Sequence, residues 1–176
     1  MTGLPSFIVI GGTCGSGKTT IAQKLGEILK YEVFDGDDFH TVENKAKMAQ
    51  GIPLNDEDRI PWLNKLVNLP AERGVSNVVI ACSALKRKYR DILVAGKSPK
   101  ESKIVMLKVS REELERRVQN RPVHYAKISL LDSQLKILEL PETNDDVNEE
   151  PHLIIVKADS PIEEVLSTIM EELKRK

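Results

Sequence analysis

FIVIGGTCGSGKT, residues 7–19, joins an apolar run to a glycine-rich segment and decides the fold. From Gly12 to Thr19 the segment fits the pattern G-x-x-x-x-G-K-[ST], and apolar residues at helical spacing follow from Ile21 to Leu29. A strand, this loop and a helix in that order are the context that a phosphate-binding loop requires. The backbone N–H groups of such a loop converge on phosphate oxygens, and the following helix adds its positive end. The alternative is a glycine-rich turn with a chance lysine.

The loop predicts binding of a nucleoside triphosphate and a role for its polar side chains. Lys18 is expected to reach the β- and γ-phosphates as a catalytic residue, and Thr19 to ligate magnesium. The residues expected around the phosphates are Gly12, Thr13, Cys14, Gly15, Ser16, Gly17, Lys18, Thr19 and Thr20. The loop does not identify the acceptor of a transferred phosphoryl group.

The rest of the chain predicts a three-layer α/β/α domain with a parallel sheet, because short β-branched runs alternate with helical patterns. A capping box, Ser160-Pro161-x-Glu163, is expected to open the last helix, with Pro161 at its first position. Pro70 is expected to end or kink a helix near residues 68–69. Residues 41–73 are read as a long helical excursion and residues 120–150 as an irregular one, both within one domain of residues 1–176. The expected strands are Phe7–Ile10, Val78–Ala81, Ile104–Val109, Leu153–Val156 and, more weakly, Tyr31–Phe34.

The composition narrows the class of protein. The chain has 176 residues, 40% hydrophobic and 30% charged, with a formal net charge of −1. The chain lacks the excess of basic residues that is typical of proteins that bind nucleic acid, and no apolar run is long enough to cross a membrane. The first residues lack a basic signal-peptide region, and two cysteines are too few for a disulfide scaffold. We therefore expect a cytoplasmic protein that binds neither nucleic acid nor membrane.

The stretch DGDDFH, residues 35–40, places three carboxylates after the expected second strand. Parallel strands end at the edge where ligands bind, so these acids are expected beside the phosphate loop. Asp35 is the candidate for holding a magnesium-bound water, since the third strand ends in Cys-Ser without an acid. Asp37 is the candidate base that accepts the proton of an attacking hydroxyl. The alternative is that the acids only cap a helix that begins near Thr41.

Three basic stretches indicate an anionic acceptor. Residues 44–63 carry Arg59, residues 82–91 carry Lys86, Arg87 and Arg90, and residues 117–134 are suited to closing over the nucleotide. Cations around a base that accepts a hydroxyl proton favour a small anionic polyol, whose carboxylate an arginine could hold in two hydrogen bonds. Any one of these cations could instead lie on a solvated helix face.

Long motifs in this order give the chain a family resemblance. GTCGSGKT, DGDDFH, N-x-x-K-M-x-x-G-x-P-L-N-D-x-D-R-x-P-W-L, C-S-A-L-K-R-x-Y-R-D and H-Y…L-L-x-S-Q…L-E resemble the gluconate kinase family, small P-loop kinases related to shikimate and adenylate kinases. The resemblance implies ATP- and Mg²⁺-dependent phosphorylation of D-gluconate at its 6-hydroxyl. It also implies a five-stranded sheet, a lid at about 120–138 and a homodimer.

The same resemblance implies roles for further residues. Arg117 and Arg121 fall in the lid on the ATP side, and Asp35 falls near magnesium. The residues that fall on the acceptor side are Asp37, His40, Arg59, Lys86, Arg90, His124 and Gln134. Adenine contacts are expected, by fold analogy, from Arg117 and the loop around residues 158–161.

Three other functions remain open from the sequence. The first is a kinase for shikimate or another sugar acid, against which the N-D-x-D-R-x-P-W-L stretch argues. Adenylate kinase activity fits less well, because an acid cluster suits a hydroxyl acceptor better than a nucleotide phosphate. The third is a nucleotide-binding protein without catalysis, against which the intact Lys18, Thr19, Asp35 and Asp37 argue.

Cys14 and Cys82 are either inert small residues or sites of oxidative inactivation.

Overall fold

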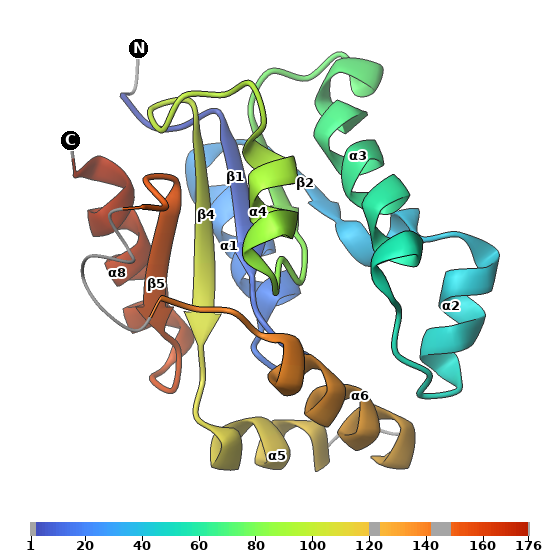
Figure 1. Ribbon diagram of the computed structural model, residues 1–176. Coiled ribbons are helices and arrows are strands. Elements are labelled where there is room, and N and C mark those ends of the chain that lie inside the picture. The colour runs from blue at the N-terminus through green and yellow to red at the C-terminus, as the bar shows by residue number, and fades with distance from the viewer. Residues whose placement is uncertain (1–2, 120–123, 142–148, 176) are drawn as a thin grey trace.

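The computed structural model describes residues 3–119, 124–141 and 149–175. Five strands form one parallel sheet in the order β2-β3-β1-β4-β5 (Figure 1). This confirms the predicted sheet, including the weaker second strand. The strands are β1 (Phe7–Gly11), β2 (Glu32–Asp35), β3 (Val78–Ala81), β4 (Ser102–Lys108) and β5 (Leu153–Lys157).

Helices cover both faces of the sheet and extend beyond its carboxyl edge (Figure 1). A short 3₁₀ turn, η1 (Gly36–Phe39), follows β2 directly. The α-helices are α1 (Lys18–Leu29), α2 (Val42–Ala49), α3 (Asp56–Arg73), α4 (Arg87–Val94), α5 (Arg111–Gln119), α6 (His124–Ile137) and α8 (Ile162–Lys174).

Alternating side chains of the strands form two separate cores. Phe7 and Val9 of β1 belong to a cluster with Trp62 and Leu66 of α3 and Leu93 of α4. Ile8 and Ile10 point the other way, into a cluster with α1 and α8. Successive strand residues face opposite sides of a sheet, so each strand contributes to both layers. The result is the three-layer α/β/α arrangement that the sequence predicts.

The carboxyl ends of the strands lie level with one another. Asp35 pairs with Ala81, and Ala81 pairs with Ile10 across β2, β3 and β1. The phosphate loop after β1 and the acid turn after β2 therefore begin at the same edge of the sheet. This register fixes the candidate site.

Three local expectations are wrong. No helix ends near residues 68–69, because α3 continues through Pro70 to Arg73 and is capped by Gly74, whose φ is 66°. Buried Leu66 and Leu69 keep this part of the helix packed on the sheet although proline cannot donate its hydrogen bond. Residues 124–137 are not irregular but form α6, whose Leu131 packs against α5.

The predicted capping box at the last helix is also wrong. Helix α8 begins at Ile162, so Pro161 is its N-cap rather than its first residue, and none of the described side chains caps it. The proline has an extended ψ of 149° and cannot be a helical residue there.

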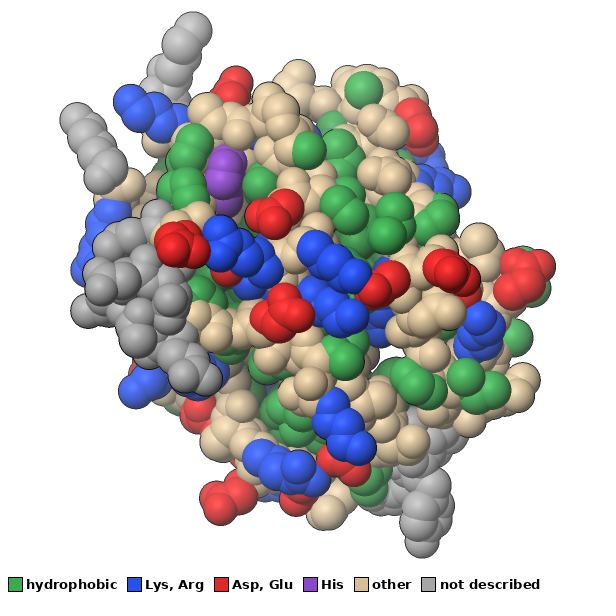
Figure 2. Space-filling model, viewed as in Figure 1, with side chains coloured by type: hydrophobic (Ala, Val, Ile, Leu, Met, Phe, Trp, Pro, Cys, Tyr) green, Lys and Arg blue, Asp and Glu red, His purple; other side chains and the backbone are tan. Residues whose placement is uncertain are grey.

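The face covered by α3 and α4 carries interspersed basic and acidic side chains rather than a field of one sign (Figure 2). Two ion pairs made by neighbouring arginines of α4 differ in their exposure to solvent. Arg87 meets Glu149 at the surface, whereas Arg90 and Glu150 form two hydrogen bonds of 2.8 Å with side chains only 2% and 9% exposed. The buried pair ties α4 to the segment that enters β5.

These adjacent glutamates provide a matched stability test. Glu150→Gln should lower the free energy of unfolding by about 3–5 kcal/mol, because it leaves the buried Arg90 cation without its counter-charge. Glu149→Gln removes a solvent-exposed partner and should have a much smaller effect. Urea unfolding measures both, and equal losses would contradict the assignment of Arg90 to the fold.

Candidate active site

The phosphate loop connects β1 to α1 and is shaped for an anion. Gly17, the N-cap of α1, has a φ of 92°, a left-handed conformation that favours glycine. Lys18 folds back, and its Nζ donates to the carbonyl of Thr13 at 2.9 Å. Ser16 Oγ is buried and has no hydrogen-bond partner among the described residues. An unsatisfied polar group of this kind fits a loop that receives phosphate oxygens.

Thr19 and Asp35, the two predicted metal residues, lie in contact. Thr19 Oγ1 donates to Asp35 Oδ2 at 2.7 Å, and Asp35 Oδ1 accepts the backbone N–H of Asp37 at 3.0 Å. Magnesium in phosphoryl-transfer sites takes one or two carboxylates together with substrate phosphates and waters. One hydroxyl and one carboxylate beside the phosphate loop fit that pattern.

Asp37 stands at the open side of the same turn. Its side chain is 73% exposed, although the protein atoms around it partly desolvate the carboxyl group. This desolvation raises the pKa of Asp37, Lys18 opposes the rise, and Asp35 and Asp38 add to it. The carboxylate is therefore a stronger base than an ordinary aspartate and remains accessible from solvent.

His40 is a buried, uncharged neighbour of Asp37. Its ring stacks on Trp62 at 4.0 Å between centroids, and Trp62 Nε1 donates to the carbonyl of Gly36 at 2.7 Å. Burial, assisted by the Arg59 cation, lowers the pKa of His40 to about 4. Its Nε2 lies 4.0 Å from Asp37 Oδ1, which is too long for a direct hydrogen bond. The stack holds η1, and with it Asp37, against α3.

Arg59 is a buried cation without a carboxylate partner among the described residues. Its side chain donates from Nε to the carbonyl of Leu54 at 3.2 Å and from Nη1 to Ser83 Oγ at 3.4 Å, and the residue is 4% exposed. The backbone carbonyl of Ser83 accepts the N–H of Gly12, so Arg59 lies beside the start of the phosphate loop. Burying an uncompensated charge is costly, and such a site favours an anionic ligand.

Two other predicted acceptor residues have protein partners instead. Lys86 donates to Asp56 at 3.1 Å, and Lys88 and Tyr89 bond to the same carboxylate. Arg90 donates to both carboxylate oxygens of Glu150 and to the carbonyls of Ala84 and Leu85. Four of the five N–H groups of the Arg90 guanidinium are thus bonded within the protein, whereas Lys86 lies nearer the surface with its side chain 22% exposed.

The lid residues are placed only in part. Arg121 and the side chain of His124 lie outside the described residues. Gln134, expected on the acceptor side, instead accepts the backbone N–H of Cys14 at 2.6 Å. Gln134 therefore contacts the phosphate loop.

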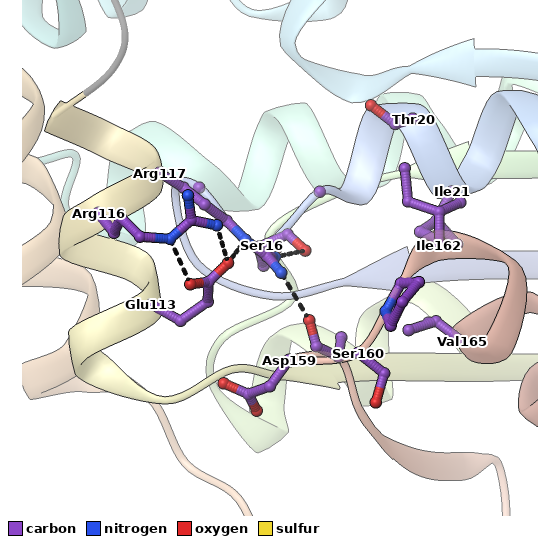
Figure 3. Close-up of a pocket in the computed structure, with 14 residues that line it drawn as sticks. Ser16, Thr20, Ile21, Glu113, Arg116, Arg117, Asp159, Ser160, Ile162 and Val165 are labelled. Atoms are coloured by element: carbon purple, nitrogen blue, oxygen red, sulfur yellow. Dashed lines mark hydrogen bonds and ion pairs between the residues drawn. The ribbon is translucent and has the colours of Figure 1, made fainter.

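The expected adenine contacts gather in one cavity of about 650 Å³ between the phosphate loop, α5 and the start of α8 (Figure 3). Arg117 donates to the carbonyls of Ala158 at 2.9 Å and Ser16 at 3.4 Å. Glu113 bonds both Arg116 and Arg117, and these arginines lower its pKa to about 2. The cavity lies beside the loop, where the nucleoside of a bound nucleotide would extend.

The two cysteines differ in surroundings. Cys82 is buried, and desolvation raises the pKa of its thiol to about 12, so the thiol stays protonated at neutral pH. Cys14 is half-buried and packs against the α5–α6 cluster.

Sequence reasoning missed several residues that shape the site. Glu113, which holds Arg117, could have been found from its i, i+4 spacing on a helix. Trp62 belongs to the motif that ends in P-W-L, but the sequence does not indicate that its ring would stack on His40. No local pattern indicates that Ser83 would join Arg59 to the phosphate loop, because the contact spans 24 residues.

The parallel sheet, the phosphate loop and the acid turn together define a P-loop kinase domain, and a family model described as shikimate kinase matches residues 14–174. A Xenopus tropicalis protein named "Probable gluconokinase" is 39% identical over 185 aligned positions, covering 97% of this chain and 94% of that protein. The thermosensitive gluconokinase of Escherichia coli K12 is 42% identical over 142 positions, 80% of this chain and 74% of that enzyme. The crystal structure of a gluconokinase from Sinorhizobium meliloti superposes with a TM-score of 0.82 at 36% identity, over 97% of this chain and 92% of that one. The chain belongs to the gluconokinase family.

The electrostatics of the acid turn generate a direct prediction. Asp38→Asn should move the titration of the Asp37 carboxyl to lower pH, because the Asp38 charge raises the Asp37 pKa. A ¹³C NMR titration of labelled aspartate measures the shift. An unchanged or higher Asp37 pKa would contradict the arrangement of these carboxylates.

Proposed function

We propose that this protein transfers the γ-phosphoryl group of ATP to the 6-hydroxyl of D-gluconate, forming 6-phospho-D-gluconate and ADP. The observation that carries the proposal is that the candidate site contains two complementary groups. Asp37 is a solvent-exposed candidate base, and Arg59 is a buried cation that has no carboxylate partner among the described residues. A hydroxyl at one end of the acceptor and a carboxylate at the other match these two groups. Relatives named gluconokinases, at 39–42% identity, support the same acceptor.

The whole chain is proposed to act as one P-loop kinase domain. Residues 41–73 would form the acceptor side and residues 120–138 the lid, to which Arg121 and His124 are assigned as nucleotide- and acceptor-side residues. ATP would place its phosphates on the loop from Gly12 to Thr20 and its adenine near Arg117. The expected cytoplasmic location and homodimer remain part of this proposal.

Each catalytic residue has a specific task. Lys18 would leave the Thr13 carbonyl and bind the β- and γ-phosphates. Thr19 and, through water, Asp35 would hold magnesium, which supplies positive charge that offsets the charge of the phosphates. Asp37 would hydrogen-bond the acceptor hydroxyl and take its proton as the new O–P bond forms. The bond from the γ-phosphorus to the β–γ bridging oxygen breaks, and ADP leaves.

The acceptor is proposed to lie between Asp37 and Arg59. Arg59 would bind the carboxylate of gluconate, and the charge-assisted hydrogen bonds would compensate its buried cation. His40 is neutral at physiological pH, so it can bond a hydroxyl of the polyol without competing for the carboxylate. Lys86, held by Asp56, would add positive charge at the rim.

Phosphorylation of shikimate is the second candidate, because the matching family model carries that description. ADP release with Mg-ATP should be measured against gluconate, shikimate, AMP and no acceptor. We expect ADP only with gluconate. ADP with shikimate alone would keep the mechanism and overturn the acceptor, and no acceptor-dependent ADP would indicate a nucleotide-binding protein without catalysis.

Asp37→Asn tests the base. Turnover should fall roughly 10²–10⁴-fold, because the amide cannot accept the proton. ATP affinity should be retained, and stability at pH 7 should not fall. Because the pKa of the Asp37 carboxyl is raised in the folded state, its ionisation lowers the free energy of unfolding as the pH rises through that pKa. The neutral amide does not ionise, so the variant lacks this destabilisation at pH 7. Asp38→Asn is the matched control and should keep turnover near wild type; equal loss in both variants would contradict the assignment.

A further inference from the structure

Helix α6 makes a direct polar contact with the phosphate loop. The Oε1 atom of Gln134 accepts the backbone N–H of Cys14 at 2.6 Å, although the two residues are 120 positions apart. Gln134 is 8% exposed, so solvent has little access to replace this bond. The contact joins an element of the lid region to the third residue of the loop.

Apolar packing surrounds this hydrogen bond. Cys14 packs against a cluster of Leu114 and Val118 from α5 and Leu131 from α6. The next loop residue, Gly15, has a φ of 82°, and a Cβ there would lie 3.0 Å from Val118 Cγ2. The loop is thus held on one side by both helices, with little room to shift toward them.

The two helices are also tied to each other. Arg111 of α5 donates to Asp132 of α6 at 2.8 Å, two residues before Gln134. Movement of α6 away from α5 would therefore break the Arg111–Asp132 pair and the Gln134–Cys14 hydrogen bond together.

We propose that Gln134 is a positioning residue that couples the placement of helix α6 to the conformation of the phosphate loop, rather than a ligand of the acceptor. Its side-chain oxygen fixes the Cys14 peptide and, through it, the amides that follow in the loop. A neutral amide suits this place, because a carboxylate would hold the same N–H group but repel the phosphates. The inference rests on the proposed function only for its kinetic readout.

The experiment compares three variants with the wild-type full chain. Gln134→Met keeps the side-chain length but removes the acceptor oxygen. Gln134→Glu keeps an acceptor and adds a negative charge. Ser133→Ala is the matched control, because the Ser133 hydroxyl bonds only the Leu130 carbonyl of its own helix among the described residues.

Amide hydrogen exchange at Cys14 tests the contact without any acceptor or turnover. Exchange should be roughly tenfold faster in Gln134→Met, since a buried N–H group loses its partner, and unchanged in Gln134→Glu and Ser133→Ala. ATP should bind more weakly to Gln134→Glu than to Gln134→Met, because only the former adds a charge. Equal Cys14 exchange in all the proteins would overturn the proposal, whether or not gluconate is the acceptor.

Steady-state kinetics separate positioning from acceptor binding. Gln134→Met should lower kcat roughly tenfold, while the KM for gluconate stays within about twofold. A rise in gluconate KM with unchanged kcat would make Gln134 an acceptor ligand and overturn the proposal. If the wild type does not phosphorylate gluconate, the proposed function fails, and the exchange and ATP-binding results still decide the role of Gln134.

Discussion

The parallel register of β1, β3 and β2 is the constraint on which the site depends. Because these strands end level with one another, the phosphate loop and the acid turn emerge side by side. The hydrogen bond from Thr19 to Asp35 then joins them directly at 2.7 Å. The positions proposed for magnesium and for the base are thus set by the main sheet, and the proposed acceptor side is added by one inserted segment, α2 and α3. A rigid sheet that carries catalytic groups at its edge can take different acceptors through changes in such a segment.

Charge is distributed so that ligands complete the site. The acid turn holds Asp35, Asp37 and Asp38 close together, and desolvation, together with the charges of Asp35 and Asp38, raises the Asp37 pKa. Arg59 is buried nearby without a carboxylate partner in the part of the chain that the structure describes. In contrast, Arg90 and Arg117 have acidic partners within the protein. This difference separates Arg90, whose counter-charge is buried with it in the fold, from Arg59, which we assign to the carboxylate of the acceptor.

Local patterns in the sequence were enough to find the strands, the phosphate loop and the Thr19–Asp35 pair. Each depends on residues close in sequence or on the rule that parallel strands share an edge. The partners of Arg90 and Gln134 could not be predicted in this way. Glu150 lies 60 residues from Arg90, and Gln134 bonds a backbone N–H group, which no side-chain pattern reveals. Helix α3 persists through Pro70 because buried leucines outweigh a lost hydrogen bond, a balance that only the packed structure shows.

The central claim is that the acceptor spans Asp37 and Arg59, with its carboxylate on the arginine. The most direct measurement is the ratio of kcat/KM for D-gluconate to that for D-glucitol, the uncharged alditol with a hydroxymethyl group in place of the carboxylate, in wild type and in Arg59→Met. The account predicts a strong preference for gluconate in the wild type that falls by roughly 10–100-fold in the variant, as expected when a charge-assisted hydrogen bond is lost. An unchanged ratio, with both substrates impaired equally, would contradict the account and place the carboxylate elsewhere.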